Sequence, residues 1–142
     1  MNDANLKALV RHRLEQAAQA LDEARLLQGS GSSLGVMNRV YYAMFYAVLA
    51  LLATREQETS KHKGAISLFD REFVQPGSFA KDFSRWLHEA FELRLEADYT
   101  PFHAPAKEEA EEAIAHASSF VSGVKEYLAP FLLASEEDIG SG

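Results

Sequence analysis

Apolar residues recur at steps of three and four along most of the chain, which is the spacing of one face of an α-helix. The clearest stripe lies near the start and consists of Leu6, Val10, Leu14, Ala17, Leu21, Ala24 and Leu27. Polar residues fill the positions between them, so the pattern predicts a helix over residues 5–28. The Gly- and Ser-rich run 29–33 predicts where this helix ends.

The next segment, 34–54, is apolar on nearly every side. A helix of this kind usually packs among the other helices of a bundle. Its most apolar run, 41–52, is well short of the roughly 20 residues that cross a bilayer. The pattern therefore predicts a buried central helix and no membrane span.

Three further helices follow. A short one is predicted over 61–73, and a longer one over 79–99 with Ser78 as its N-cap. The last is predicted to carry Pro105 in its first turn and to fray or end near Pro130.

No segment alternates apolar and polar residues at a period of two, so the sequence predicts no sheet. Five helices joined by short loops predict an all-α, mostly antiparallel, up-and-down bundle. We expect this bundle to occupy residues 1–134, and we expect the acidic, Gly-rich residues 135–142 to form a flexible tail.

Composition narrows the functional classes. The chain has 142 residues, of which 47% are hydrophobic, enough for one domain with its own core. It has no cysteine, which excludes disulfides and thiolate chemistry. The polar, amphipathic N-terminus lacks the apolar core of a signal peptide, so we expect a cytoplasmic protein.

The net charge of −7 is unevenly distributed, because residues 95–142 carry ten Asp/Glu and only two Lys/Arg. An overall negative charge argues against indiscriminate nucleic-acid binding, which depends on neutralising phosphates. It leaves room for a local basic site in the first two thirds of the chain.

Polar side chains enter the apolar second helix at one place, residues 38–45. Arg39, Tyr42 and Tyr46 lie along one side of this helix, since residues three and four apart are neighbours. Arg39 could serve a binding site. Alternatively, it could be a structural arginine that pairs with a carboxylate on a neighbouring helix.

The run Lys61-His62-Lys63-Gly64 places two ammonium groups and an imidazole at a predicted helix N-terminus. Free backbone N–H groups at such a terminus bind anions, and the cations would add to that attraction. The alternative is an ordinary solvated loop.

The run 94–99 ends the predicted fourth helix. Arg94 and Asp98 are four residues apart and can pair, and His103 follows beyond Tyr99. An arginine and a histidine can together cleave RNA without a metal, the histidine moving a proton and the arginine stabilising the phosphorane. The alternative is a salt bridge at a helix end beside a surface histidine.

The sequence predicts neither a metal site nor a cofactor. None of the five histidines has a second histidine at metal-ligand spacing, and the phosphate-loop and dinucleotide-binding signatures are missing.

Taken in order, the runs 38–52, 61–74 and 94–99 resemble a prokaryotic branch of the HEPN family, which carries R-YYA-F, KHKG and R-x-x-A-D-Y motifs. The resemblance implies four long helices plus one shorter helix, commonly assembled as a homodimer. It also implies a toxin–antitoxin setting, with a minimal nucleotidyltransferase as partner. The residues that match the branch and that we assign to nucleotide or phosphate binding are Arg39, Tyr42, Lys61, His62, Lys63, Arg94, Asp98 and Tyr99.

Three functional hypotheses remain open. The first is a HEPN module that binds a nucleotide, an RNA phosphate or a nucleotidyltransferase. The second is a metal-independent endoribonuclease toxin, with Arg94 and either His103 or His62 as its catalytic residues. The ribonuclease branches place four to six residues between arginine and histidine, whereas eight separate Arg94 from His103. The third is a structural bundle that only binds a partner.

Overall fold

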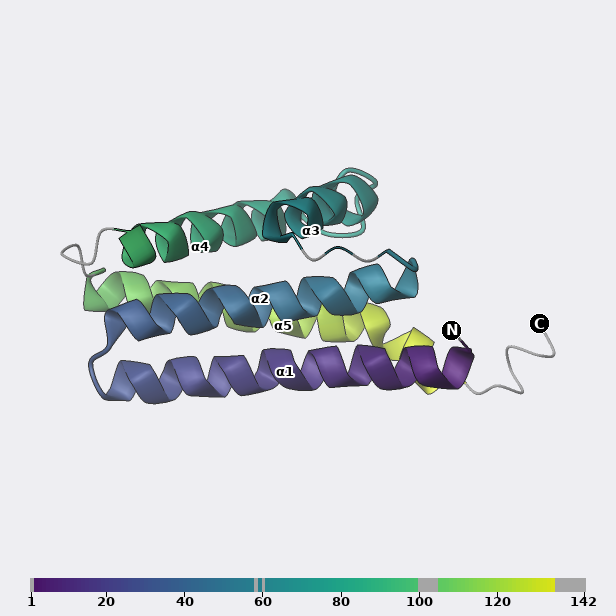
Figure 1. Cartoon of the computed structure of the whole chain (residues 1–142), viewed down its shortest axis with the longest axis horizontal. Coiled ribbons are helices and arrows are strands. Elements are labelled where there is room, and N and C mark those ends of the chain that lie inside the picture. Colours follow the sequence, from purple (N-terminus) through teal and green to yellow (C-terminus); the bar gives the residue numbers. More distant parts are fainter. Residues whose placement is uncertain (1, 58, 60, 100–104, 135–142) are drawn as a thin grey trace.

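The computed structural model describes residues 2–57, 59, 61–99 and 105–134, without the side chains of 97–99. It contains five α-helices: α1 (Asp3–Gly29), α2 (Ser33–Thr54), α3 (His62–Phe69), α4 (Lys81–Tyr99) and α5 (Lys107–Leu133). The described part of the chain has no strand. Figure 1 shows four long helices and one short helix running up and down in a bundle, as the sequence predicts.

The first two helices form an antiparallel hairpin (Figure 1). Gly31 adopts a φ of +83°, a conformation that glycine takes without steric cost, and the chain reverses there. The Ser32 hydroxyl then accepts a hydrogen bond from the Gly35 N–H at 3.3 Å and caps α2.

The central helix, α2, contacts α1, α3, α4 and α5. By length and composition alone it could span a membrane, because the apolar window extends beyond the run 41–52. However, 72% of this window is buried inside the bundle, as expected for the core helix of the fold.

The predicted third helix is divided into two parts. It forms α3 and then a π-helical turn over Asp70–Val74, in which the Gln75 N–H bonds the Asp70 carbonyl at 2.8 Å. The turn allows both Phe69 and Phe73 to be fully buried.

The prediction that Ser78 caps α4 is wrong, because α4 begins at Lys81. The aromatic core fixes the chain just before the helix: Phe79 is 7% exposed, and its N–H bonds the Phe73 carbonyl at 3.0 Å. Gly77, with a φ of +92°, makes the turn before Phe79. The helix therefore begins only beyond Phe79, at Lys81.

The two prolines of the last helix also differ from prediction. Pro105 precedes the N-cap residue Ala106, and α5 continues through Pro130 to Leu133. Side chains of α1 explain the extra turn, because Lys7 and Arg11 donate to the carbonyls of Ala134 and Leu132. They satisfy the acceptors that a helix C-terminus leaves open.

Candidate nucleotide-phosphate site

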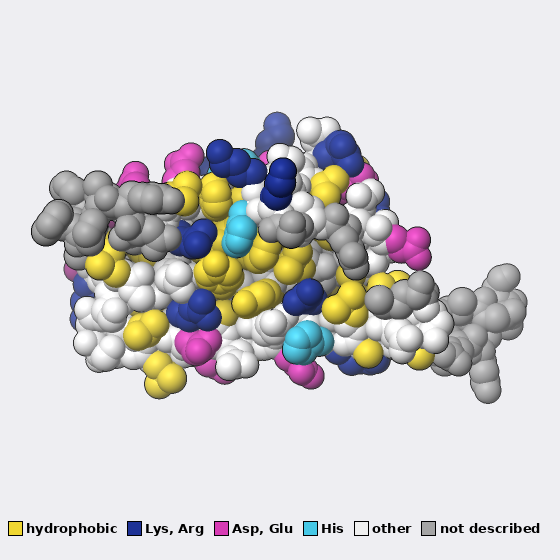
Figure 2. Space-filling view, in the orientation of Figure 1, with side chains coloured by type: hydrophobic (Ala, Val, Ile, Leu, Met, Phe, Trp, Pro, Cys, Tyr) yellow, Lys and Arg dark blue, Asp and Glu magenta, His cyan; other side chains and the backbone are white. Residues whose placement is uncertain are grey.

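One stripe of α2 is not covered by another helix. Its residues are half-buried and recur at steps of three and four; we call Arg39, Tyr42, Tyr46 and Leu49 the open stripe. Figure 2 shows apolar side chains across the middle of this face, between α1 and the layer of α3 and α4, with Lys, Arg and His side chains around them.

Two arginines from different helices meet at the ring of Tyr42. The Arg39 guanidinium carbon lies 5.1 Å from the ring centroid, and that of Arg94 lies 5.3 Å from it. Arg94 also lies 5.5 Å from the ring of Tyr41. These distances fit cation–π contacts, so the first and third sequence motifs come together in space.

His62, at the start of α3, joins the same group. Its ring stacks on Phe45 with centroids 4.4 Å apart and planes inclined by 16°. Its Nδ1 lies 2.6 Å from the hydroxyl oxygen of Tyr41, which is fully buried. The second motif therefore belongs to the site too, which we call the cation–aromatic site: Arg39, Tyr41, Tyr42, Phe45, His62 and Arg94.

The buried phenol favours one tautomer of His62. Among the described residues, His62 Nδ1 is the sole hydrogen-bond partner of the Tyr41 hydroxyl. A buried O–H without an acceptor is costly, so the hydroxyl donates and Nδ1 accepts. The proton of the neutral ring then sits on Nε2, which makes Nε2 a hydrogen-bond donor.

Burial disfavours the charged form of both His62 and Tyr41, and the charge of Arg94 reinforces this at His62 but opposes it at Tyr41. Desolvation, followed by the positive charge of Arg94, lowers the pKa of His62. Burial raises the pKa of Tyr41, although Arg94 opposes this. Both side chains are therefore neutral near pH 7, while Arg94 carries the charge at the site.

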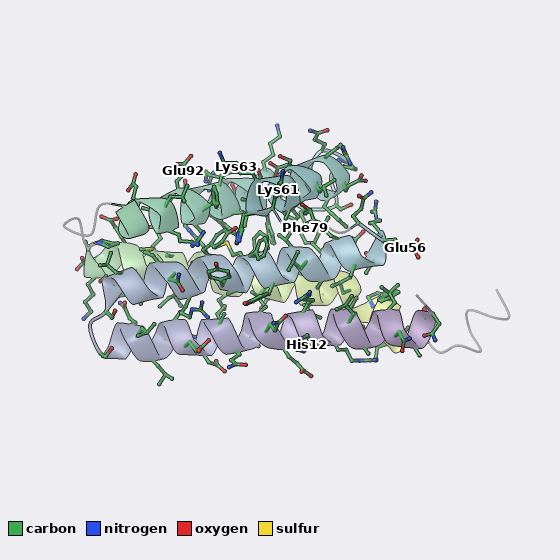
Figure 3. All side chains as sticks on the ribbon, in the orientation of Figure 1. His12, Glu56, Lys61, Lys63, Phe79 and Glu92 are labelled. Carbon is green, nitrogen blue, oxygen red and sulfur yellow. The ribbon has the colours of Figure 1, made fainter. Side chains whose placement is uncertain are left out.

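Lys61 and Lys63 flank His62, and both are exposed (Figure 3). Lys61 is the N-cap of α3, and no described side chain caps the first N–H groups of that helix. Thr59 folds over this end so closely that a Cβ on Gly64 would lie 2.9 Å from its hydroxyl oxygen. Glycine therefore lets the loop fold onto the start of α3.

The alternative role proposed for Arg39 is also present. Its guanidinium lies 3.3 Å from Glu23 on α1 and donates to Asn38 at 3.0 Å. Arg39 thus pairs with a carboxylate of a neighbouring helix while it covers one face of Tyr42.

Three predicted site residues lie outside what the structure describes. His103 is outside the described ranges, and α4 includes Asp98 and Tyr99 only as backbone. Among the residues that are described, no three His, Asp or Glu side chains gather closely enough to hold a metal ion.

Sequence reasoning missed the part that Tyr41 plays. Its position in the most apolar run of the predicted buried helix, 41–52, assigned it to the core, where it does lie. The signal that could have identified it is its hydroxyl, because a buried phenol needs a hydrogen-bond partner. The nearby KHKG run supplies that partner in His62.

Comparison with known proteins identifies the family of the chain. A model of the HEPN domain matches residues 10–127. A "UPF0332 protein" of Thermotoga maritima is 33% identical over 80% of this chain and 86% of its own. Two Methanocaldococcus jannaschii proteins, each named "Putative toxin", are 33% and 34% identical over 81% and 84% of this chain, and over 78% and 88% of their own lengths. The chain therefore belongs to the HEPN family.

Proposed function

We propose that this HEPN protein binds the phosphate of a nucleotide or RNA strand at the cation–aromatic site, as part of a toxin–antitoxin-type system. The observation that carries the proposal is the convergence of Arg39, Arg94 and His62 around Tyr42 from three helices. The toxin names of two relatives support the biological setting.

The donor set suits a phosphate. Guanidinium groups offer planar pairs of N–H donors that match phosphate oxygens. The Nε2–H of His62 adds a neutral donor, and the α3 N-terminus adds backbone N–H groups. Lys61 and Lys63 supply positive charge at the rim, where they attract the ligand without a desolvation cost.

Binding of a fluorescein-labelled single-stranded RNA, followed by anisotropy, tests the proposal. We expect Lys61→Ala and Arg94→Met each to weaken binding at least about fivefold, since a charged hydrogen bond contributes about 1.5–3 kcal/mol. Lys125→Ala removes an exposed lysine from α5 and should leave the affinity unchanged. Equal affinity in all four proteins would refute the proposal.

A second candidate is a metal-independent endoribonuclease. The observation that favours it is that Arg94 and His62 contact the same two rings, those of Tyr41 and Tyr42. His62 Nε2 would take the ribose 2′-hydroxyl proton as that oxygen attacks phosphorus, the bond to the 5′ oxygen would break, and water would protonate that oxygen. This step requires the other tautomer, in which Nδ1 donates to Tyr41.

Incubation with mixed RNA in the presence of a chelator separates the two candidates. Cleavage that survives the chelator and disappears in His62→Phe would establish the nuclease. Intact RNA together with binding would leave His62 as a phosphate ligand.

We further propose that the protein is a homodimer and that a minimal nucleotidyltransferase is its partner. The part of the open stripe outside the cation–aromatic site supports the dimer, because Tyr46 and Leu49 are incompletely covered within one chain. We expect Leu49→Glu to convert the protein to a monomer in light scattering. A monomeric wild type would refute the dimer.

A further inference from the structure

A hollow of about 400 Å³ lies between α3 and α4, next to the cation–aromatic site. Its apolar lining comes from Ile66 of α3 and from Phe91 and Leu95 of α4. This volume falls within the range of small-molecule sites, and aromatic lining is typical of them.

Polar groups line the hollow as well. Ser67 and Glu92 come from facing helices, and Lys63 and His88 complete the lining. His88 is held in place by Asp70, with Nε2 and Oδ2 2.7 Å apart. Figure 3 shows Lys63 and Glu92 at the outer edge of the α3 and α4 layer, on the side away from α1.

The mixture of charges argues against a second phosphate in the hollow. Glu92 would repel a phosphate, but its carboxylate accepts hydrogen bonds from the amino group of a base. An apolar, partly aromatic lining with a few polar groups at its edge matches an unpaired nucleobase, which stacks on aromatic rings and is read along its edge.

The hollow lies beside the phosphate site, and the ring of Phe91 connects the two. Phe91 lines the hollow, and its ring centroid lies 5.5 Å from that of Tyr41, whose hydroxyl bonds His62. Lys63 follows His62 directly on α3, and Leu95 follows Arg94 on α4. On each of the two helices, therefore, one residue belongs to the cation–aromatic site and the next residue lines the hollow.

We infer that the hollow receives the base of the nucleoside phosphate whose phosphate binds at the cation–aromatic site. This inference rests on the proposed function and defines the ligand class: a free nucleotide or an unpaired residue of RNA, with preference for a base that carries an amino group. A base held in a duplex cannot reach the hollow without leaving its stack.

The test uses Ser67→Trp, which places an indole in the hollow from an exposed position. Ser122→Trp, at an exposed position of α5 that does not line the hollow, is the matched control. The probe is a fluorescein-labelled single-stranded RNA. The competitors are the same RNA unlabelled, its abasic counterpart, its duplex, GMP and ribose 5-phosphate.

For the wild type and Ser122→Trp we expect intact single-stranded RNA to compete at least tenfold better than abasic or duplex RNA. We expect Ser67→Trp to reduce that advantage below about twofold, while competition by abasic RNA is unchanged. Competition by GMP better than by ribose 5-phosphate would extend the site to free nucleotides; competition by RNA alone would restrict it to strands.

Two results would overturn the inference, and they differ. If intact RNA still competes much better than abasic RNA in Ser67→Trp, the base binds outside the hollow, and the proposed phosphate site is unaffected. Absence of binding by every competitor, with no effect of Lys61→Ala on the probe, would remove the phosphate site and the base site together.

Discussion

The side chains of Tyr41 and His62 depend on each other. Tyr41 is fully buried, and its hydroxyl has the imidazole nitrogen 2.6 Å away as its partner among the described residues. His62 is held by this bond and by its stack on Phe45. Removing either group leaves the other polar atom buried or half-buried without its bond, which costs more than the bond contributes.

We therefore expect Tyr41→Phe to lower the free energy of unfolding by about 1–2 kcal/mol. His62→Phe should have a similar cost, and the double variant should cost clearly less than the two together, because neither unpaired group remains. Urea unfolding measures all three. Tyr127→Phe, at a more exposed tyrosine, should change stability by less than about 0.5 kcal/mol. Strict additivity would show that the pair is not coupled.

The charge of Arg94 should be visible in the titration of His62. Burial is the larger cause of the lowered pKa and Arg94 the smaller. Arg94→Met should therefore raise the pKa of His62 without restoring its ordinary value near 6.5. NMR titration of the imidazole measures this, with Arg85→Met on the exposed side of α4 as the control. An unchanged titration midpoint of His62 in Arg94→Met would show that the charge of Arg94 does not influence the imidazole.

The same shift has a stability consequence with a definite sign. A histidine whose folded pKa is lowered favours the folded state when it is neutral. Its contribution is complete above about pH 6.5 and is lost as the pH falls below that value. Acid should thus weaken the contact between His62 and Tyr41.

At the scale of elements, α4 and α5 approach closely at one glycine. A Cβ on Gly123 of α5 would lie 2.7 Å from the ring of Phe83 on α4. That ring cannot easily move, because it packs against Phe79, Trp86 and Phe120 at centroid distances of 5.2–5.3 Å. The absence of a side chain at this position sets the distance between the two helices.

Gly123→Ala should consequently destabilise the protein by about 1–2 kcal/mol, since overpacking outweighs the gain of roughly 1 kcal/mol in helix propensity. Gly29→Ala is the matched control, because nothing lies within 4 Å of its Cβ position. It should be neutral or slightly stabilising. Thermal unfolding compares the two variants, and equal melting temperatures would contradict the role of Gly123.

Over the whole molecule, charge is separated between a basic site and an acidic last third. The chain carries −7 overall, yet four cations, Arg39, Lys61, Lys63 and Arg94, lie at or beside the cation–aromatic site. A few local contacts should give RNA binding a modest salt dependence, because each neutralised phosphate adds about 0.7 to the slope for a single strand.

We expect the logarithm of the RNA association constant to fall with the logarithm of salt concentration with a slope of roughly −3 or smaller in magnitude. Lys61→Ala should reduce the magnitude by about 0.7, and Lys125→Ala should not change it. Anisotropy titrations at several salt concentrations provide the slope. A slope of zero would show that the protein neutralises no phosphate when it binds RNA.

Local patterns in the sequence were enough to predict five helices and a resemblance to the HEPN family. Periodicity places α1 and α2 within two residues of their observed ends, because those stripes are long and their caps are local. The order and spacing of three short motifs resembles the HEPN family, and the match over residues 10–127 establishes it.

The contacts between the three motifs follow from the packing of the helices and not from any local pattern. Local rules placed the start of α4 and the end of α5 wrongly, because Phe79 and the α1 cations act from elsewhere in the chain. Likewise, no spacing shows that Arg94 covers Tyr42 or that Tyr41 bonds His62, since these contacts join residues on different helices. Helical periodicity is a local property, whereas a site built across helices depends on how the core packs them.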